Sequence, residues 1–202
     1  MDQNKRKVNE AIRFELIAFL FVQLSNNLMI AMLLTLALLP LPFTLADFSE
    51  SATIKNWKVV NDGVMGGKSE SELTPSKNNT AIFKGDVSLK NNGGFASIRY
   101  SFNQIDISGA TKAFIKLKGD KKNYQFRVKN NENDRHVYKH EFETSGKWET
   151  IEIPLTEMEP TFRGMRPNVV NYLARDLSQI GLLIANKKSE AFLLEISNIW
   201  LE

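Results

Sequence analysis

The chain has 202 residues, no cysteine and a formal net charge of +3. Its length allows one domain of ordinary size with an N-terminal extension, and the lack of cysteine excludes disulfides, cysteine zinc sites and thiol nucleophiles. Basic and acidic residues alternate along most of the sequence, without the stripe of basic and aromatic residues that nucleic-acid-binding proteins usually carry, so we expect no nucleic-acid partner.

The first 46 residues have the order of a targeting or anchoring segment. A basic cluster precedes a run without charged residues from Leu16 to Ala46. This order is typical of a secretory signal with cleavage after Ala46, and the run also approaches the roughly 20 residues that span a bilayer. We therefore predict an export signal or a membrane-anchor helix over residues 1–46, with the body exported to the periplasmic side. A buried hydrophobic helix, or a true start at Met29 or Met32, is the alternative, and the body would then stay cytoplasmic.

Residues 47–202 are predicted to form a single all-β domain. Segments rich in β-branched and aromatic residues are separated by Gly, Asn, Asp and Pro clusters, a spacing typical of a sandwich or barrel. Apolar and polar residues alternate clearly from Tyr124 to Lys129. We expect hairpin turns at 120–123 and 145–146, and one helix-like stretch at 169–177. The expected strands are 57–61, 68–73, 80–89, 95–102, 113–118, 124–129, 136–143, 148–154, 179–185 and 191–200.

The sequence lacks the common arrangements of catalytic and metal-binding residues. On the predicted strand 136–143, His136 and His140 would be roughly 13 Å apart, too far for two ligands of one metal ion. No serine lies in a nucleophile-elbow pattern, and Gly63–Gly67 does not match the dinucleotide fingerprint. A carboxylate pair for glycoside cleavage stays open, because Asp and Glu are plentiful. We therefore expect a protein without catalytic residues, metal or cofactor.

Two glycine-bearing stretches carry the first candidate site residues. In Asn61–Ser69 the glycines indicate positive φ values or close backbone approach, and Asp62 can bridge backbone amides. This stretch is either a complex β-turn or a loop that presents Met65 to a partner. Asn91–Phe95 is likewise either a hairpin turn or part of a recognition surface. The candidate binding residues in the two stretches are Asp62, Met65, Gly66, Gly67, Ser69, Asn92, Gly93 and Gly94.

Further candidates are two arginines placed inside predicted strands. Arg99 and Arg127 each lie on the face opposite a run of apolar residues. Arginine is rarely buried without a partner, so both are either solvated or line a groove. Tyr138 and Trp148 would supply the apolar walls of such a groove.

The long connection after Pro160 holds the last candidates, Phe162 and Arg163. A connection of this length beside a sandwich often has a function. It is either a binding loop or a lid over one end of the core, with Phe162 as the plug.

Taken together, these stretches resemble the complex I intermediate-associated protein 30 family over residues 55–202. The Asp-Gly-Val-Met-Gly-Gly sequence at 62–67 is the specific motif. The remaining parts of the resemblance are 57–61, 68–69, 83–89, 92–99, 124–127, 148–154, 162–164, 180–184 and 192–199. The family's signature positions fall on Asp62, Met65, Gly66, Gly67, Ser69, Asn92, Gly93, Gly94, Arg99, Arg127, Arg163 and Gly164.

The resemblance implies a galactose-binding-like jelly-roll β-sandwich and, from the mitochondrial members, a chaperone-like role in the assembly of respiratory complex I. It implies no catalytic set. The leading hypothesis is a non-catalytic assembly factor that binds a protein client, such as a subunit of a membrane complex, at an exposed apolar patch near Met65 and Phe162. The alternative is a carbohydrate-binding module that holds a glycan on the concave face of the jelly roll. The membrane would be a partner only through an uncleaved N-terminal segment.

Overall fold

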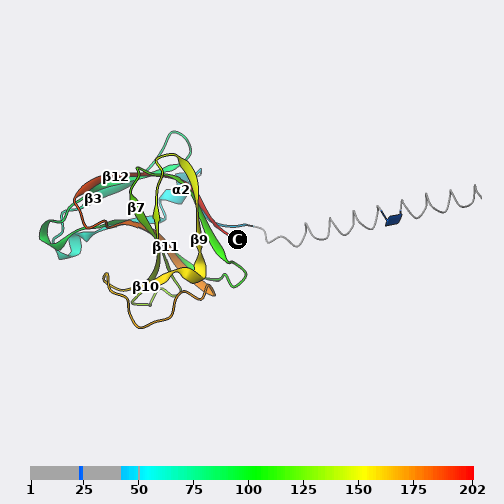
Figure 1. The fold of residues 1–202 in the computed structure, drawn as a ribbon. Coiled ribbons are helices and arrows are strands. Elements are labelled where there is room, and N and C mark those ends of the chain that lie inside the picture. The colour runs from blue at the N-terminus through cyan, green and yellow to red at the C-terminus, as the bar shows by residue number, and fades with distance from the viewer. Residues whose placement is uncertain (1–22, 25–41, 50) are drawn as a thin grey trace, which may run out of the picture. The chain divides into compact units, whose positions relative to one another are not determined.

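The computed structural model describes residues 23–24, 42–49 and 51–202, without the side chains of 51, 52, 64 and 65. The predicted signal or anchor helix therefore lies largely outside the described residues. Within the described ranges, no helix is long and apolar enough to cross a membrane. Residues Pro42–Glu202 form one compact unit, which Figure 1 draws in colour.

This unit is a sandwich of two antiparallel sheets (Figure 1). Sheet A contains β1 (Phe43–Asp47), β3 (Glu70–Pro75), β4 (Ala81–Val87), β6 (Lys112–Lys118), β9 (Trp148–Pro154) and β12 (Glu190–Leu201). Its order is β3-β4-β12-β6-β9, with β1 also paired to β12. Sheet B contains β2 (Trp57–Asn61), β5 (Ala96–Asp106), β7 (Asn123–Lys129), β8 (Val137–Glu143), β10 (Glu159–Thr161) and β11 (Asp176–Ile184). Its order is β10-β8-β7-β11-β5-β2.

The helices of the unit Pro42–Glu202 are short and lie between strands. They are α2 (Ser51–Ile54) and the 3₁₀ turns η1 (Asp62–Met65), η2 (Lys90–Asn92) and η3 (Leu155–Glu157). The core lies between the sheets because side chains alternate between the two faces of each strand. In β7, for example, Tyr124, Phe126 and Val128 are buried, whereas the residues between them are only half-buried.

Every expected strand is present, although the ends of several differ. Three elements were not predicted from the sequence: β1, the short edge strand β10 and the single turn of α2. The helix expected at 169–177 is wrong, because 169–173 has no regular structure and β11 already begins at Asp176. The assignment to an all-β sandwich of two antiparallel sheets is confirmed, and the finer galactose-binding-like jelly roll stays a prediction.

The folded unit begins before residue 47. Thr44 and Ala46 of β1 pair with Trp200 and Ile199 of β12, and Ala46 is buried. Cleavage after Ala46 would therefore remove most of a strand of sheet A. This strand could not be recognised in the sequence, because its residues continue the apolar run of the predicted signal.

The two expected hairpins are wrong, because each turn crosses from one sheet to the other. Residues 119–122 lead from β6 in sheet A to β7 in sheet B, and 144–147 lead from β8 in sheet B to β9 in sheet A. The two crossovers pack together: a Cβ on Gly119 would lie 2.3 Å from Thr144 Oγ1. Turn residues reveal that the chain reverses, but not which sheet receives the next strand.

Candidate functional site

The side chain of Asp62 ties together the two glycine-bearing stretches. Asp62 Oδ1 accepts a hydrogen bond from the backbone N–H of Ser69 at 3.0 Å, and Oδ2 accepts one from Ser69 Oγ at 2.5 Å. Oδ2 also accepts hydrogen bonds from the backbone N–H groups of Gly94 at 2.7 Å and Phe95 at 3.3 Å. The β2–β3 and β4–β5 connections both cross between the sheets. One buried carboxylate therefore joins two crossovers that are distant in sequence.

The glycines of these stretches leave room for this carboxylate. A Cβ on Gly67 would lie 2.2 Å from Asp62 Oδ1, and one on Gly93 would lie 2.6 Å from Oδ2. Gly66 has a φ of 86°, which favours glycine, and its carbonyl oxygen accepts a hydrogen bond from Asn91 Nδ2 at 3.0 Å. Close approach and backbone conformation thus explain Gly66, Gly67 and Gly93 without a ligand.

The hydrogen bonds around Asp62 also determine its charge. Burial raises the pKa of this carboxyl, but the donors of Ser69, Gly94 and Phe95 outweigh it and hold the pKa below its ordinary value. The carboxylate is therefore ionised at neutral pH and already occupied by donors. These contacts favour the turn interpretation of the motif. The side chain of Met65 lies outside the described atoms, so its presentation to a partner stays a prediction.

Arg99 of β5 and Arg127 of β7 lie on either side of Gly181 of β11. The strand register pairs Gly181 with Arg99 in one ladder and with Arg127 in the other. Neighbouring strands are about 4.8 Å apart, so the two arginine Cα atoms are separated by about 10 Å. Lys58 pairs with Arg99, and Lys139 pairs with Arg127. The outer face of sheet B therefore carries four basic residues in one row, with a glycine at its centre.

The two guanidinium groups are partly buried and have few partners. Arg127 donates through Nε and Nη2 to Gln125 Oε1, at 2.9 and 2.6 Å. Within the described part of the chain, Arg99 makes no side-chain hydrogen bond and neither arginine forms an ion pair. Burial, and next the charge of Arg99, lower the pKa of Arg127 to about 10, so this group remains protonated at neutral pH. Burial also lowers the pKa of Arg99.

The expected aromatic walls are not beside the arginines. Tyr138 is buried in the core, where its ring centroid lies 5.0 Å from that of Tyr172. Trp148 is exposed, but it belongs to β9 in sheet A. Both residues were placed by sequence alone, which does not show the sheet or the face on which a strand residue lies.

Phe162, Arg163 and Gly164 form a tight turn. The backbone groups of Phe162 and Met165 exchange two hydrogen bonds, of 2.8 and 3.0 Å. The φ values of Arg163 and Gly164 are 52° and 79°, as a type I′ turn requires. Phe162 is half-buried, and its ring lies under the guanidinium groups of Arg135 and Arg163, at 5.5 and 5.4 Å. This stretch is ordered by its turn, and Phe162 is not a fully buried plug.

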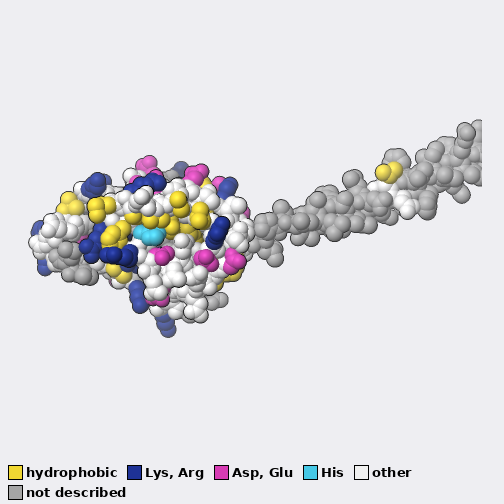
Figure 2. All heavy atoms as spheres, turned by 90° about the horizontal axis from the view of Figure 1, so that it is seen from below, with side chains coloured by type: hydrophobic (Ala, Val, Ile, Leu, Met, Phe, Trp, Pro, Cys, Tyr) yellow, Lys and Arg dark blue, Asp and Glu magenta, His cyan; other side chains and the backbone are white. Residues whose placement is uncertain are grey.

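The connection between β10 and β11, from Phe162 to Arg175, exposes several large apolar side chains; we call it the apolar loop. Tyr172 anchors it: the side chain is buried, its N–H donates to the Met158 carbonyl oxygen at 3.0 Å, and its hydroxyl donates to the Asp176 carbonyl oxygen at 2.7 Å. Figure 2 shows a face of the molecule on which basic side chains gather beside hydrophobic ones. The exposed side chains of the apolar loop are Met165 (67%), Val170 (66%), Leu173 (59%) and Val169 (39%).

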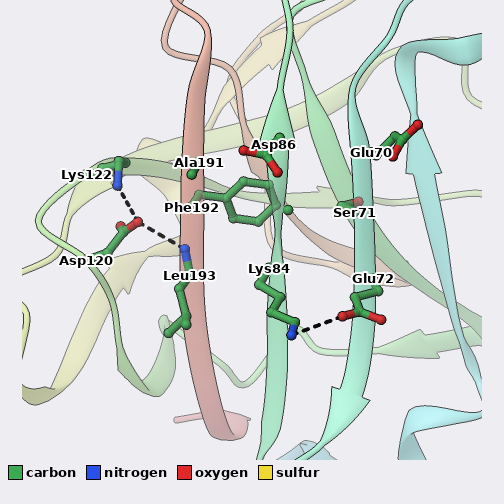
Figure 3. A pocket seen from close by; sticks show the side chains of 11 residues that line it. Glu70, Ser71, Glu72, Lys84, Asp86, Asp120, Lys122, Ala191, Phe192 and Leu193 are labelled. Atoms are coloured by element: carbon green, nitrogen blue, oxygen red, sulfur yellow. Dashed lines mark hydrogen bonds and ion pairs between the residues drawn. The ribbon is translucent and has the colours of Figure 1, made fainter.

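An open hollow of about 710 Å³ lies on sheet A (Figure 3). Lys84 forms an ion pair with Glu72, and Lys122 forms one with Asp120. Glu70 and Asp86 are directly opposite in the β3–β4 ladder, but their carboxylates point away from one another in Figure 3. These two residues thus do not form a facing carboxylate pair of the kind that glycoside cleavage needs.

The histidines provide no metal site with the residues around them. His140 belongs to β8, and His136 precedes that strand with its ring edge-to-face on Tyr138 at 5.0 Å. In the parts of the chain that the structure describes, no group of three or more His, Cys, Asp or Glu side chains could hold a metal ion.

Sheet order and site geometry define a β-sandwich in which the hydrogen bonds of Asp62 join two crossover loops. A β-sandwich is the architecture of many binding modules. The family model described as complex I intermediate-associated protein 30 matches residues 46–196, and the chain belongs to this family. The resemblance seen in the sequence is thereby confirmed. A comparison with curated proteins found no match.

Solved structures with a similar fold include carbohydrate-binding modules. The family 11 module of the cellulosomal cellulase Lic26A-Cel5E of Clostridium thermocellum is 20% identical, with a TM-score of 0.60 over 81% of this chain and 95% of that one. A family 11 module from Clostridium thermocellum in complex with a β-1,3-1,4-mixed-linked tetrasaccharide gives 19% identity and a TM-score of 0.58, over 79% of this chain and 94% of that one. An agarase is 14% identical, with a TM-score of 0.55 over 80% of this chain and 24% of that one. At these identities the likeness concerns the fold.

Proposed function

We propose that this protein is a non-catalytic binding module of the assembly-factor type, which holds a polypeptide client at the apolar loop. Its family membership supports a role in complex assembly, and the exposed apolar side chains of the loop carry the proposal. Monomeric proteins rarely expose contiguous apolar surface unless it binds something. Here Tyr172 and the Arg163–Gly164 turn hold the loop, so that binding would order few additional residues.

The charges around the loop favour a polypeptide occupant with acidic residues. Arg163, Arg166 and Arg175 are exposed on the same connection. Arg166 is held by an ion pair with Glu159 and donates through Nη2 to Asn171 Oδ1 at 2.9 Å. A client segment with apolar side chains flanked by carboxylates would match both the exposed apolar side chains and the positive charge of this surface.

Crosslinking in native cells, followed by quantification of the captured partner, tests the proposal. Replacement of two exposed loop residues, Val170→Ser with Leu173→Ser, should reduce partner recovery about tenfold, the effect of losing one or two interface anchors. The matched control is Leu193→Ser, which removes an exposed apolar side chain from sheet A. Equal recovery with the loop variant and the control would refute the proposal. Unfolding curves for both variants establish that they remain folded.

Glycan binding is the second candidate, and one observation favours a place for it. Phe114 and Trp200 stack on the outer face of sheet A, with ring centroids 5.3 Å apart and an interplanar angle of 14°. Exposed Trp148 lies on the same sheet. Titration with a β-1,3-1,4-mixed-linked tetrasaccharide, followed by tryptophan fluorescence, should then give a saturable change that Trp200→Ala abolishes. An unchanged spectrum would end this candidate for that sugar.

A further inference from the structure

The outer face of sheet B concentrates positive charge that the carboxylate of Glu141, on β8, offsets only in part. Lys58, Arg99, Arg127 and Lys139 follow one another across the sheet on β2, β5, β7 and β8. Of these four, only Lys139 forms an ion pair with a described residue, Glu141, at 2.6 Å. Both central arginines are half-buried, and an unpaired charge is costly where water is partly excluded.

Gly181 lies between the two arginines and adds no side chain to the space that separates them. It is buried in the central strand β11, and a Cβ there would lie 2.8 Å from the Ile98 carbonyl oxygen and 3.4 Å from Arg99 Cγ. The stem of Arg99 therefore lies against this glycine. A glycine inside a strand often marks a place where a ligand or another backbone approaches closely.

The hydrogen-bonding capacity of the two guanidinium groups is largely unused. Each has five N–H donors, of which Arg127 directs two to Gln125 and Arg99 directs none to a described acceptor. Gln125 fixes the orientation of Arg127 from the same strand, two residues away. The guanidinium group of Arg127 is therefore held in one orientation beside the positive charge of Arg99. Both groups keep N–H donors that no described acceptor occupies.

We propose that Arg99 and Arg127 form an oxyanion-binding site on the outer face of sheet B, with Gly181 as its floor. A single oxyanion between the arginines satisfies their free donors and offsets their mutual repulsion. The ligand is a carboxylate, sulfate or phosphate group, because guanidinium forks match such groups through paired charge-assisted hydrogen bonds. The site does not depend on the apolar loop or on the proposed client.

Nuclear magnetic resonance of the arginine Nε–H groups in the full-length chain tests this site directly. Sodium acetate, sodium sulfate and inorganic phosphate are titrated separately, with sodium chloride holding the ionic strength constant. We expect the Arg99 and Arg127 signals to shift saturably with one shared dissociation constant, while the exposed Arg163 signal does not. Saturation by acetate alone identifies a carboxylate site, and saturation by sulfate or phosphate identifies a tetrahedral oxyanion site.

Two variants separate the arginine pair from general surface charge. Arg127→Gln should weaken anion binding at Arg99 by about tenfold, the loss of one or two charge-assisted hydrogen bonds. Lys129→Gln, which removes a lysine two residues away on the same face, should change it less than about twofold, because exposed charges are screened by salt. The proposal is overturned if no added anion gives saturable shifts, if Arg163 responds equally, or if the two variants behave alike. If Arg127→Gln does not fold, the wild-type titration alone decides.

Discussion

Replacing Asp62 with asparagine should reveal how much the two crossovers depend on one carboxylate. Asparagine keeps the shape of the side chain, but one oxygen becomes an NH₂ group that faces donors of Ser69, Gly94 or Phe95. Hydrogen bonds to a charged group contribute about 1.5–3 kcal/mol each, and they are not additive. With the two strongest bonds to Oδ2 lost or weakened, we expect Asp62→Asn to lower the free energy of unfolding by about 3–5 kcal/mol at neutral pH.

The pH dependence of this difference provides an independent check. Because the folded-state pKa of Asp62 lies below its ordinary value, ionised Asp62 stabilises the fold above the unfolded pKa of about 3.9. This stabilisation fades as the pH falls through the lower, folded-state pKa. The gap between wild type and Asp62→Asn should therefore be widest near neutral pH and should narrow in acid.

Urea unfolding followed by circular dichroism, at neutral and at acid pH, measures both quantities. Asp106→Asn is the matched control, because Asp106 Oδ1 also accepts a backbone hydrogen bond, from Ser108 at 2.8 Å, but in an exposed turn. This control should leave the unfolding midpoint almost unchanged. A loss below about 1 kcal/mol for Asp62→Asn, or a gap that does not depend on pH, would refute the assigned role of the carboxylate.

Two further substitutions probe the crossovers and the loop. Gly67→Ala should destabilise the fold by about 2 kcal/mol in urea unfolding, because its Cβ would lie 2.2 Å from Asp62 Oδ1, whereas Gly63→Ala, with no atom within 4 Å, should be nearly neutral. A similar loss of stability in the two variants would mean that the space between Gly67 and Asp62 can accommodate a Cβ. Tyr172→Phe should lower the free energy of unfolding by about 1 kcal/mol and increase hydrogen exchange in the apolar loop, because it removes the bond to the Asp176 carbonyl oxygen. Unchanged exchange would show that this hydroxyl does not anchor the loop.

The local sequence pattern was sufficient to predict most strands and to recognise the family. The alternation from Tyr124 to Lys129 identifies a half-buried strand wherever the sheet lies, because side-chain direction has a period of two residues. The same reasoning failed where apolar residues of the sequence are exposed in the structure. Apolar residues at 169–173 suggested a helix face, yet most of them are exposed on a loop.

The meaning of the motif residues required the tertiary structure. The sequence placed Asp62, Gly67 and Gly93 together as candidates, but only the contacts showed that the glycines accommodate the carboxylate. Gly181 was missed altogether, since nothing in a short apolar strand indicates which residues flank it on neighbouring strands. A conspicuous glycine inside such a strand was the one signal that could have found it.

By itself, the sequence determined most of the strands, the all-β class and the family, because these follow from periodicity and from motifs that lie within a few residues of one another. The tertiary structure decided which strands share a sheet, that β1 belongs to the folded unit, and that Arg99 and Arg127 lie on either side of one glycine. Strand register joins residues that are tens of positions apart, and it is set by the packing of the whole sandwich.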